Sequence, residues 1–234
     1  MLLECIERET GANPSWSIVW LHGLGADGHD FVPIVPELLR RDWPALRFVF
    51  PHAPVRPVTI NNGVPMRAWY DIVDIDLANR ADEAGVAESV LQVEALIGRE
   101  VERGVPRERV VLAGFSQGGA VTLAVGLRSA QPLGGLVALS TYVPSANKAR
   151  DVMAAGAGKQ PVFMGHGSQD PVVPFQAGQQ SAALLRELGF EVDWHAYPMP
   201  RTGSCPLPPA PSDRTRRADP PPPPASPPRY RRAG

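Results

Sequence analysis

One pentapeptide, Gly-Phe-Ser-Gln-Gly at positions 114–118, constrains the fold of this chain most strongly. It follows the short apolar run Val110–Ala113, which predicts a buried strand, and precedes 119–125, which reads as a helix. A serine between a strand and a helix in this pattern lies in a sharp turn, where larger neighbours than glycine would clash. The turn exposes the serine Oγ, and the N–H of Gln117 lies at a helix N-terminus, where an oxyanion is stabilised. The pattern predicts Ser116 as a nucleophile; the alternative is a glycine-rich turn that merely contains a serine.

The size and charge of the chain exclude several other classes of protein. Its 234 residues suffice for one sizeable α/β domain, and the net charge of -1 gives no electrostatic reason to bind nucleic acid or an anionic membrane. The two cysteines, Cys5 and Cys205, lie near opposite ends without metal or redox spacing, which suits a reducing compartment. No apolar stretch reaches the 18 or so residues of a membrane span, and acidic residues interrupt the N-terminus early. We therefore expect a cytoplasmic protein without a membrane span, and a homodimer remains an option.

Two stretches in the first third of the chain are candidates for the walls of a site. The apolar run 17–21 predicts a strand that enters the glycine-containing loop 22–28, where the backbone N–H of Leu24 is a candidate second oxyanion donor. An ordinary turn is the alternative. After a helix at about 32–40 and a strand at 46–50, three prolines in 51–57 argue against regular structure. In the long loop that follows, Trp69 and Tyr70 either line an acyl pocket or pack the loop onto the core.

The remaining pattern alternates helices and strands, which predicts a mainly parallel sheet. Apolar residues recur at helical spacing over about 81–103, and a further helix is expected at about 176–188. Strands are expected at 135–140, 161–167 and 191–197. Asp170 follows the second of these strands, downstream of the serine, which is where the carboxylate of a catalytic triad belongs. The alternative is a simple Asp-Pro turn.

Five stretches together resemble the phospholipase/carboxylesterase family, the bacterial relatives of acyl-protein thioesterases. They are Leu-His-Gly-Leu-Gly at 21–25, Pro-His-Ala-Pro at 51–54, Trp-Tyr-Asp-Ile at 69–72, the serine motif at 112–119, and His-Gly-Ser-Gln-Asp-Pro-Val-Val-Pro at 166–174. Their order and spacing match the family over roughly residues 1–199. The resemblance implies an α/β-hydrolase fold, with a mainly parallel central sheet and helices on both faces. It also implies hydrolysis of carboxylic esters or thioesters without metal or cofactor, with Ser116 and Asp170 in the triad and the Leu24 and Gln117 N–H groups as oxyanion hole.

The chain departs from the family where the third triad member is expected. In the family, the last strand ends in Tyr-Pro-Met-Gly-His, and that histidine is the general base. Here Tyr-Pro-Met at 197–199 is followed by Pro200 and Arg201, and an arginine cannot serve because it stays protonated. None of the five histidines follows the last strand; His195, inside it, is a weak substitute. The resemblance therefore implies that turnover by this chain is severely impaired.

The segment 200–234 differs in composition from the rest of the chain. Of 27 prolines, 13 fall between Pro198 and the end, and 200–234 shows no helical apolar pattern, although the family has an amphipathic helix there. We expect this Pro/Arg-rich tail to be disordered or partly polyproline II. One interpretation is a shifted reading frame from about Met199, which we favour because the composition changes abruptly inside a motif. If Arg201 and Thr202 are encoded CGC-ACN, the shifted frame contains CAC, a histidine codon, where the catalytic histidine is expected. The other is a functional tail that presents Pro220–Pro224 to a partner.

Two function classes remain open from the sequence. The first is a serine hydrolase, with lysophospholipase and protein depalmitoylase as alternatives to a small-ester carboxylesterase. The second is a non-catalytic protein that binds acyl ligands or engages a partner through its proline-rich tail.

Overall fold

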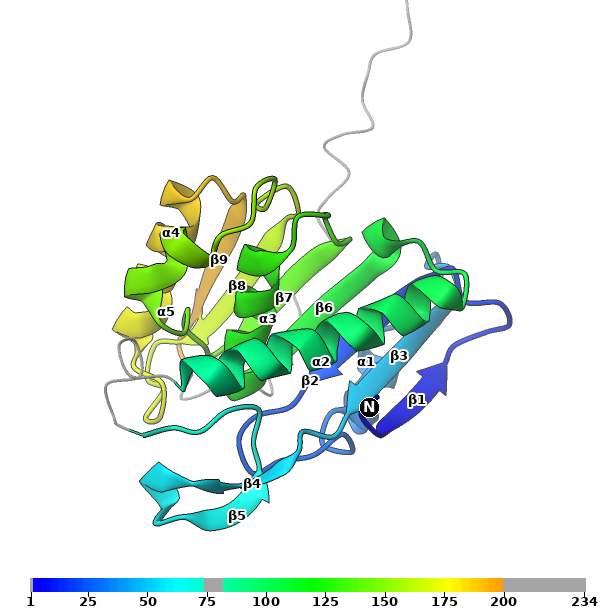
Figure 1. The fold of residues 1–234 in the computed structure, drawn as a ribbon. Helices are drawn as coiled ribbons and strands as arrows, with labels where there is room; N and C mark the ends of the chain where they lie inside the picture. The colour runs from blue at the N-terminus through cyan, green and yellow to red at the C-terminus, as the bar shows by residue number, and fades with distance from the viewer. Residues whose placement is uncertain (1, 74–81, 200–234) are drawn as a thin grey trace, which may run out of the picture.

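The structure is a computed structural model, which describes residues 2–73 and 82–199. These residues form a seven-stranded sheet with the strand order β1-β3-β2-β6-β7-β8-β9 and a separate two-stranded ribbon, β4-β5 (Figure 1). The expectation for the tail concerns residues outside the described part of the chain.

The central sheet is mainly parallel, as the sequence predicts. Only β1 runs antiparallel, along β3; the other five neighbouring pairs in the sheet are parallel. The strands are β1 (Cys5–Glu9), β2 (Trp16–Leu21), β3 (Leu46–Pro51), β6 (Val110–Phe115), β7 (Gly135–Leu139), β8 (Val162–Gly167) and β9 (Val192–Tyr197). Because parallel strands end at the same edge, the loops after β2, β6, β7 and β8 meet on one side of the molecule.

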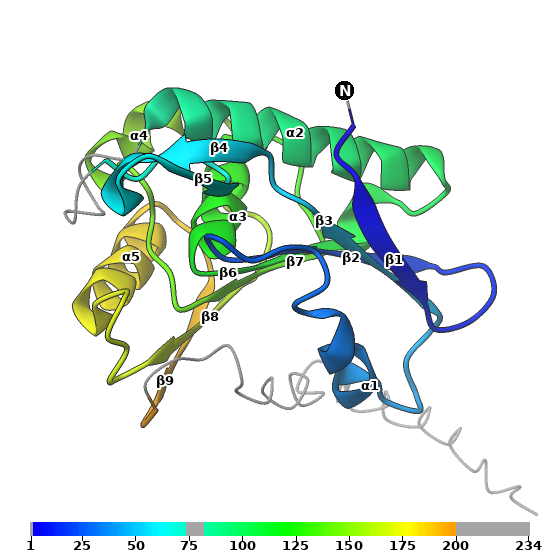
Figure 2. The same ribbon diagram turned by 90° about the horizontal axis from the view of Figure 1, so that it is seen from below.

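Helices cover both faces of the sheet, but unequally (Figure 2). The helices are α1 (Val35–Leu38), α2 (Glu83–Glu102), α3 (Gln117–Arg128), α4 (Ala149–Val152) and α5 (Phe175–Glu187). Residues of α2, α3, α4 and α5 pack in one apolar cluster with side chains of the central strands. On the other face, α1 packs against β2 and β3 in a smaller cluster. Helix α3 is buried almost throughout, because it lies between the sheet and α2.

Three details differ from the sequence-based expectations. The helix expected at 32–40 is a 3-10 turn, Val32–Ile34, followed by the single turn α1, because Pro33 and Pro36 lack the N–H groups that a longer helix needs. Strand β1 was not anticipated. The expectation that 51–57 lacks regular structure is wrong, since β4 (Val55–Val58) pairs with β5 (Val64–Arg67). Pro57 lies opposite Pro65 in this isolated ribbon. Proline has no backbone N–H to donate to a neighbouring strand, but a two-stranded ribbon has no third strand that would need that hydrogen bond.

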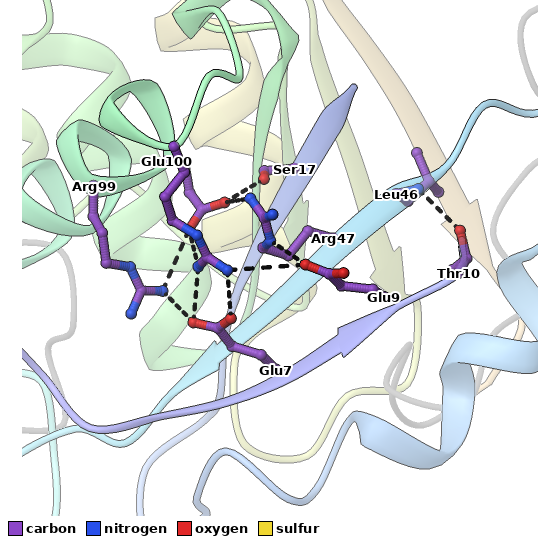
Figure 3. Close-up of polar contacts among 9 residues, drawn as sticks. Glu7, Glu9, Thr10, Ser17, Leu46, Arg47, Arg99 and Glu100 are labelled. Atoms are coloured by element: carbon purple, nitrogen blue, oxygen red, sulfur yellow. Dashed lines mark hydrogen bonds and ion pairs between the residues drawn. The ribbon is translucent and has the colours of Figure 1, made fainter. Parts of the chain in front are cut away.

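A cluster of charged side chains joins the edge strand β1 to α2 (Figure 3). At its centre is Glu100 of α2, which is fully buried and accepts hydrogen bonds from Ser17 Oγ at 2.6 Å and Arg47 Nη1 at 2.9 Å. Arg47 also pairs with Glu9 at 2.8 Å, and Arg99 with Glu7 at 2.8 Å. A buried carboxylate is tolerated only when its oxygens are satisfied in this way. The cluster lies where β2 and β3 begin, at the opposite end of the sheet from the loops that follow β2 and β6.

Among the described residues, none of the helices combines the length and apolar character that crossing a membrane requires.

Candidate active site

Ser116 occupies the sharp turn that the pentapeptide predicts. Strand β6 ends at Phe115 and α3 begins at Gln117, so the serine alone makes the reversal, with φ 53° and ψ -117°. Two hydrogen bonds hold this strained backbone: Ser116 N donates to Leu139 O at 2.8 Å, and Thr141 Oγ1 donates to Ser116 O at 2.7 Å. The last residue of β7 and the loop that follows it thus fix the serine on both of its peptide groups.

The two flanking glycines are required by close backbone approach. A Cβ on Gly114 would lie 2.3 Å from Gly118 O, and a Cβ on Gly118 would lie 2.4 Å from Leu21 O. Contacts this short do not occur between real atoms, so any side chain at either position would displace the turn. The small residues predicted from the sequence are therefore a steric necessity here.

Leu24 and Gln117 both line the cavity that contains Ser116. Gln117 is the first residue of α3, so its N–H has no acceptor within the helix. Within residues 2–73 and 82–199, neither this N–H nor that of Leu24 donates to another group. Two backbone donors beside the serine are thus available to a ligand, and the helix dipole of α3 favours negative charge at that point.

The loop that carries Leu24 is held by the buried ring of His22. Its Nδ1 donates to Gly23 O at 2.7 Å and its Nε2 accepts from Ala53 N at 3.0 Å. Burial lowers the pKa of His22, although the bond to Gly23 opposes the shift, so the ring is neutral at physiological pH. Since both nitrogens are used, this histidine acts as a brace between two loops.

The side chain of Gln117 joins the elbow to the segment that contains Trp69 and Tyr70. Its Oε1 accepts from Trp69 N at 2.9 Å and its Nε2 donates to Tyr70 O at 2.7 Å. Both aromatic residues are fully buried, and Trp69 Nε1 donates to His22 O at 2.9 Å. They support the site from within the core; that they contact a substrate stays a prediction.

A cavity of about 480 Å³ opens beside Ser116. This volume lies within the range of small-molecule sites. Most of its wall is apolar, with a few polar groups near the serine. The lining residues that the sequence reasoning did not single out include Phe31, Ile60, Asn61, Phe115, Tyr142 and Val172. Tyr142 was within reach of that reasoning, because it lies in the loop after a parallel strand, at the same edge of the sheet as Ser116.

Asp170 lies in the turn after β8, and the residues that follow it reach the cavity. Its Oδ1 accepts hydrogen bonds from Val172 N at 2.9 Å and Val173 N at 3.0 Å. Val172 and Val173 both line the cavity with Ser116. The carboxylate thus shapes the loop that forms one wall, whatever further part it has.

Each of the five histidine rings has a hydrogen bond away from Ser116 and Asp170. His166, which is buried, has its Nε2 3.0 Å from Val173 O, and burial lowers its pKa. His195 of β9 has its Nε2 2.9 Å from Asp193 Oδ1 and stacks on Phe163. The remaining rings pair as follows: His22 with Gly23 and Ala53, His29 with Asp27, and His52 with Gly28 N. In the described part of the chain, no imidazole is hydrogen-bonded to the serine or to the aspartate.

Asp27, His29 and His52 are the described side chains that come closest to a metal-binding arrangement. One ligand atom from each lies within 4.8 Å of the others. However, His29 Nδ1 is paired with Asp27 Oδ1 at 3.0 Å, and Gly28 N donates to His52 Nδ1 at 3.1 Å. The lone pair on His52 Nδ1 is therefore engaged, and the proton consequently sits on Nε2. Asp27 and His29 thus pair with each other and His52 is engaged by the Gly28 N–H, which does not fit a metal site.

Comparison with known proteins agrees with this geometry. The model of the phospholipase/carboxylesterase family matches residues 6–206. The chain belongs to this family. Acyl-protein thioesterase 1 of Cryptococcus neoformans is 37% identical over 206 residues, covering 81% of this chain and 86% of the relative. Carboxylesterase SOBER1 of Arabidopsis thaliana is 38% identical over 183 residues, covering 77% and 80%.

Solved structures give the same assignment of fold. The crystal structure of Arabidopsis thaliana SOBER1 superposes with a TM-score of 0.72 at 37% identity, covering 78% of this chain and 88% of that one. Acyl-protein thioesterase 2 of Zea mays gives a TM-score of 0.71 at 28% identity, covering 83% and 89%. The α/β-hydrolase fold and membership of a family of carboxylesterase- and thioesterase-type serine hydrolases are thereby confirmed.

Proposed function

We propose that the cavity beside Ser116 binds carboxylic esters or acyl thioesters and that Ser116 is the nucleophile. Its Oγ attacks the acyl carbonyl, and the N–H groups of Leu24 and Gln117 stabilise the oxyanion. The alcohol or thiol then leaves, and water releases the acid from the acyl-enzyme. No metal or cofactor takes part in these steps. The observation that supports the proposal is the juxtaposition of a strained serine and two available backbone donors at one cavity.

The proton of Ser116 Oγ must go to a base, and Asp170 would orient that base and stabilise its cation. All five histidine rings are hydrogen-bonded elsewhere, and the family's histidine is replaced by Pro200-Arg201. We therefore propose that acylation by this chain is slow. In serine proteases, loss of the triad histidine lowers turnover by about 10⁶, and about 10³–10⁴ over water persists from binding and the oxyanion hole.

The test is hydrolysis of p-nitrophenyl acetate and butyrate by three forms of the protein. They are the chain itself, the double variant Pro200→Gly/Arg201→His, and the same double variant with Ser116→Ala. We expect activity at least about 10³-fold above the chain only in the double variant, since restoring the base recovers most of the loss. Ordinary esterase rates in the unaltered chain would disprove the impairment, and full activity without Ser116 would disprove the nucleophile.

A second candidate function, binding without turnover, is favoured by the engagement of every histidine. In that case the chain binds acyl ligands but neither it nor the double variant hydrolyses esters. Lysophospholipids and acylated proteins differ from small esters in their leaving groups. Comparing the hydrolysis rates of p-nitrophenyl esters and acyl thioesters of the same acyl chain length tests which leaving group is preferred.

A further inference from the structure

Two tyrosines, one of which lines the cavity, are joined through their hydroxyl groups. Tyr70 Oη and Tyr142 Oη lie 2.9 Å apart, although the two residues are 72 positions apart in the chain. Tyr70 is fully buried and Tyr142 is 4% exposed. Tyr142 lines the cavity beside Ser116, whereas Tyr70 is not among its lining residues. The pair is thus a polar contact between the core and the substrate cavity.

Both tyrosines are positioned by the elbow itself. On one side, Ser116 is hydrogen-bonded to Leu139 and Thr141, the residues that lead into Tyr142. On the other side, the Gln117 amide holds the carbonyl of Tyr70 at 2.7 Å. Since the nucleophile and its neighbour fix the two ends, the hydroxyl pair has a defined place relative to Ser116.

Counting protons gives the direction of the hydrogen bond. Two hydroxyls carry two protons, and their mutual contact uses only one of them. Among the described residues, no other group accepts from either hydroxyl. If Tyr142 donated to Tyr70, the second proton would be sealed in the core without an acceptor, which costs more than a hydrogen bond gains. The favourable arrangement has Tyr70 donating to Tyr142, which leaves the Tyr142 proton available to another acceptor, and Tyr142 is the one of the two residues that lines the cavity.

We propose that the Tyr142 hydroxyl is a hydrogen-bond donor to the substrate and that it favours acyl groups that carry an oxygen near the reacting carbonyl. Ether, hydroxyl and keto oxygens have the required lone pairs, whereas a plain alkyl chain leaves the donor unsatisfied. This inference rests on the proposed function of the cavity as an acyl site. It assigns selectivity to a side chain that takes no part in the chemical steps.

The electrostatics of the pair keep it in the donor form. Burial raises the pKa of Tyr142, although the hydrogen bond from Tyr70 opposes the shift. Burial, followed by the neighbouring hydroxyl, raises the pKa of Tyr70 well above its usual value. Both phenols therefore remain protonated throughout the physiological range.

The experiment compares two ligands that differ by one atom. Methoxyacetanilide and butyranilide have acyl groups of equal length in which an oxygen replaces a methylene, and as amides they persist where esters would be cleaved. Their dissociation constants are measured by calorimetry on the full chain, on Tyr142→Phe and on Tyr70→Phe. The two variants each remove one hydroxyl from the same pair, so each controls for the other, and their melting temperatures report folding.

The ratio of the two dissociation constants is the readout, because intrinsic differences between the ligands cancel between proteins. We expect Tyr142→Phe to shift the ratio about 5- to 10-fold against methoxyacetanilide. Tyr70→Phe should keep the ratio within about 2-fold of the unaltered chain, since Tyr142 retains its proton.

An unchanged ratio in Tyr142→Phe, an equal shift in both variants, or no binding of either anilide to the unaltered chain would overturn the inference. If the ratio shifts as expected but the variant with a restored histidine hydrolyses no ester, the proposed function fails while this binding preference stands.

Discussion

Replacing Ser116 by glycine should stabilise the protein while removing the proposed nucleophile. The backbone at this position, with φ 53° and ψ -117°, lies where only glycine is unstrained. A non-glycine residue held in such a region lowers the stability of the fold by about 1–3 kcal/mol. The hydrogen bonds to Leu139 and Thr141 hold Ser116 in this conformation despite the strain. Glycine relieves that cost but adds about 0.4–1 kcal/mol of unfolded-chain entropy.

The net effect expected for Ser116→Gly is a gain of about 1 kcal/mol, or roughly 2–4 °C in Tm for a domain of this size. Deleting the hydroxyl should itself cost little, because Ser116 Oγ has no hydrogen bond to the described residues. Ser116→Ala is the matched control: it also lacks the hydroxyl but keeps the Cβ, and hence the strain. Thermal and urea unfolding of the three chains, followed by circular dichroism, give the comparison. If Ser116→Gly is no more stable than Ser116→Ala, the turn is not strained and the reasoning fails.

Two further predictions concern stability. Gly118→Ala should lower the free energy of unfolding by at least about 2 kcal/mol, because its Cβ would lie 2.4 Å from a carbonyl oxygen. Gly98→Ala, whose Cβ would have nothing within 4 Å, should raise it by about 0.5–1 kcal/mol. Equal urea midpoints for the two variants would contradict the steric argument. Burial alone would raise the pKa of Glu100, but hydrogen bonds from Ser17 and Arg47 lower it below the usual 4.5. The stability that the ionised Glu100 contributes is therefore complete above pH 4.5 and is lost as the pH falls through the pKa of Glu100 in the folded protein. Glu100→Gln should cost about 3–5 kcal/mol at pH 7 and flatten the acid limb of the stability curve; an unaltered limb would show that other carboxylates control it.

The sequence predicts the parts of this molecule that depend on local pattern. The parallel sheet, α2 and α5 follow from apolar periodicity, and the turn at Ser116 follows from its flanking glycines. The short α1 and the β4-β5 ribbon were mispredicted because prolines act differently in a single turn and in an isolated ribbon than in longer elements. Strand β1 is an edge strand in which Glu7, Arg8 and Glu9 are consecutive, so it lacks the apolar/polar alternation that predicts a strand. Its pairing with β3 depends on partners distant in the chain.

The site was predictable only in part. Ser116, Leu24 and Asp170 stand in motifs that can be read directly, and their proposed roles remain to be tested. The Gln117 side chain was overlooked because its importance lies in a bridge to residues 48 positions earlier, which no local pattern reveals. The place of Tyr142 near Ser116 could have been inferred from the strand before it, but its contact with Tyr70 could not, since that contact forms only when the two loops meet at the end of the sheet.

The position of the charged cluster at the beginning of β2 and β3 has a consequence for protein engineering. A strand of six residues spans roughly 20 Å, so Glu100 and its arginines lie about one strand length from the cavity at the other end. Substitutions separated by that distance, with no shared partner, usually have additive effects on stability. Laboratory evolution can therefore first introduce stabilising substitutions at the cluster and then introduce destabilising substitutions in the loops around the cavity.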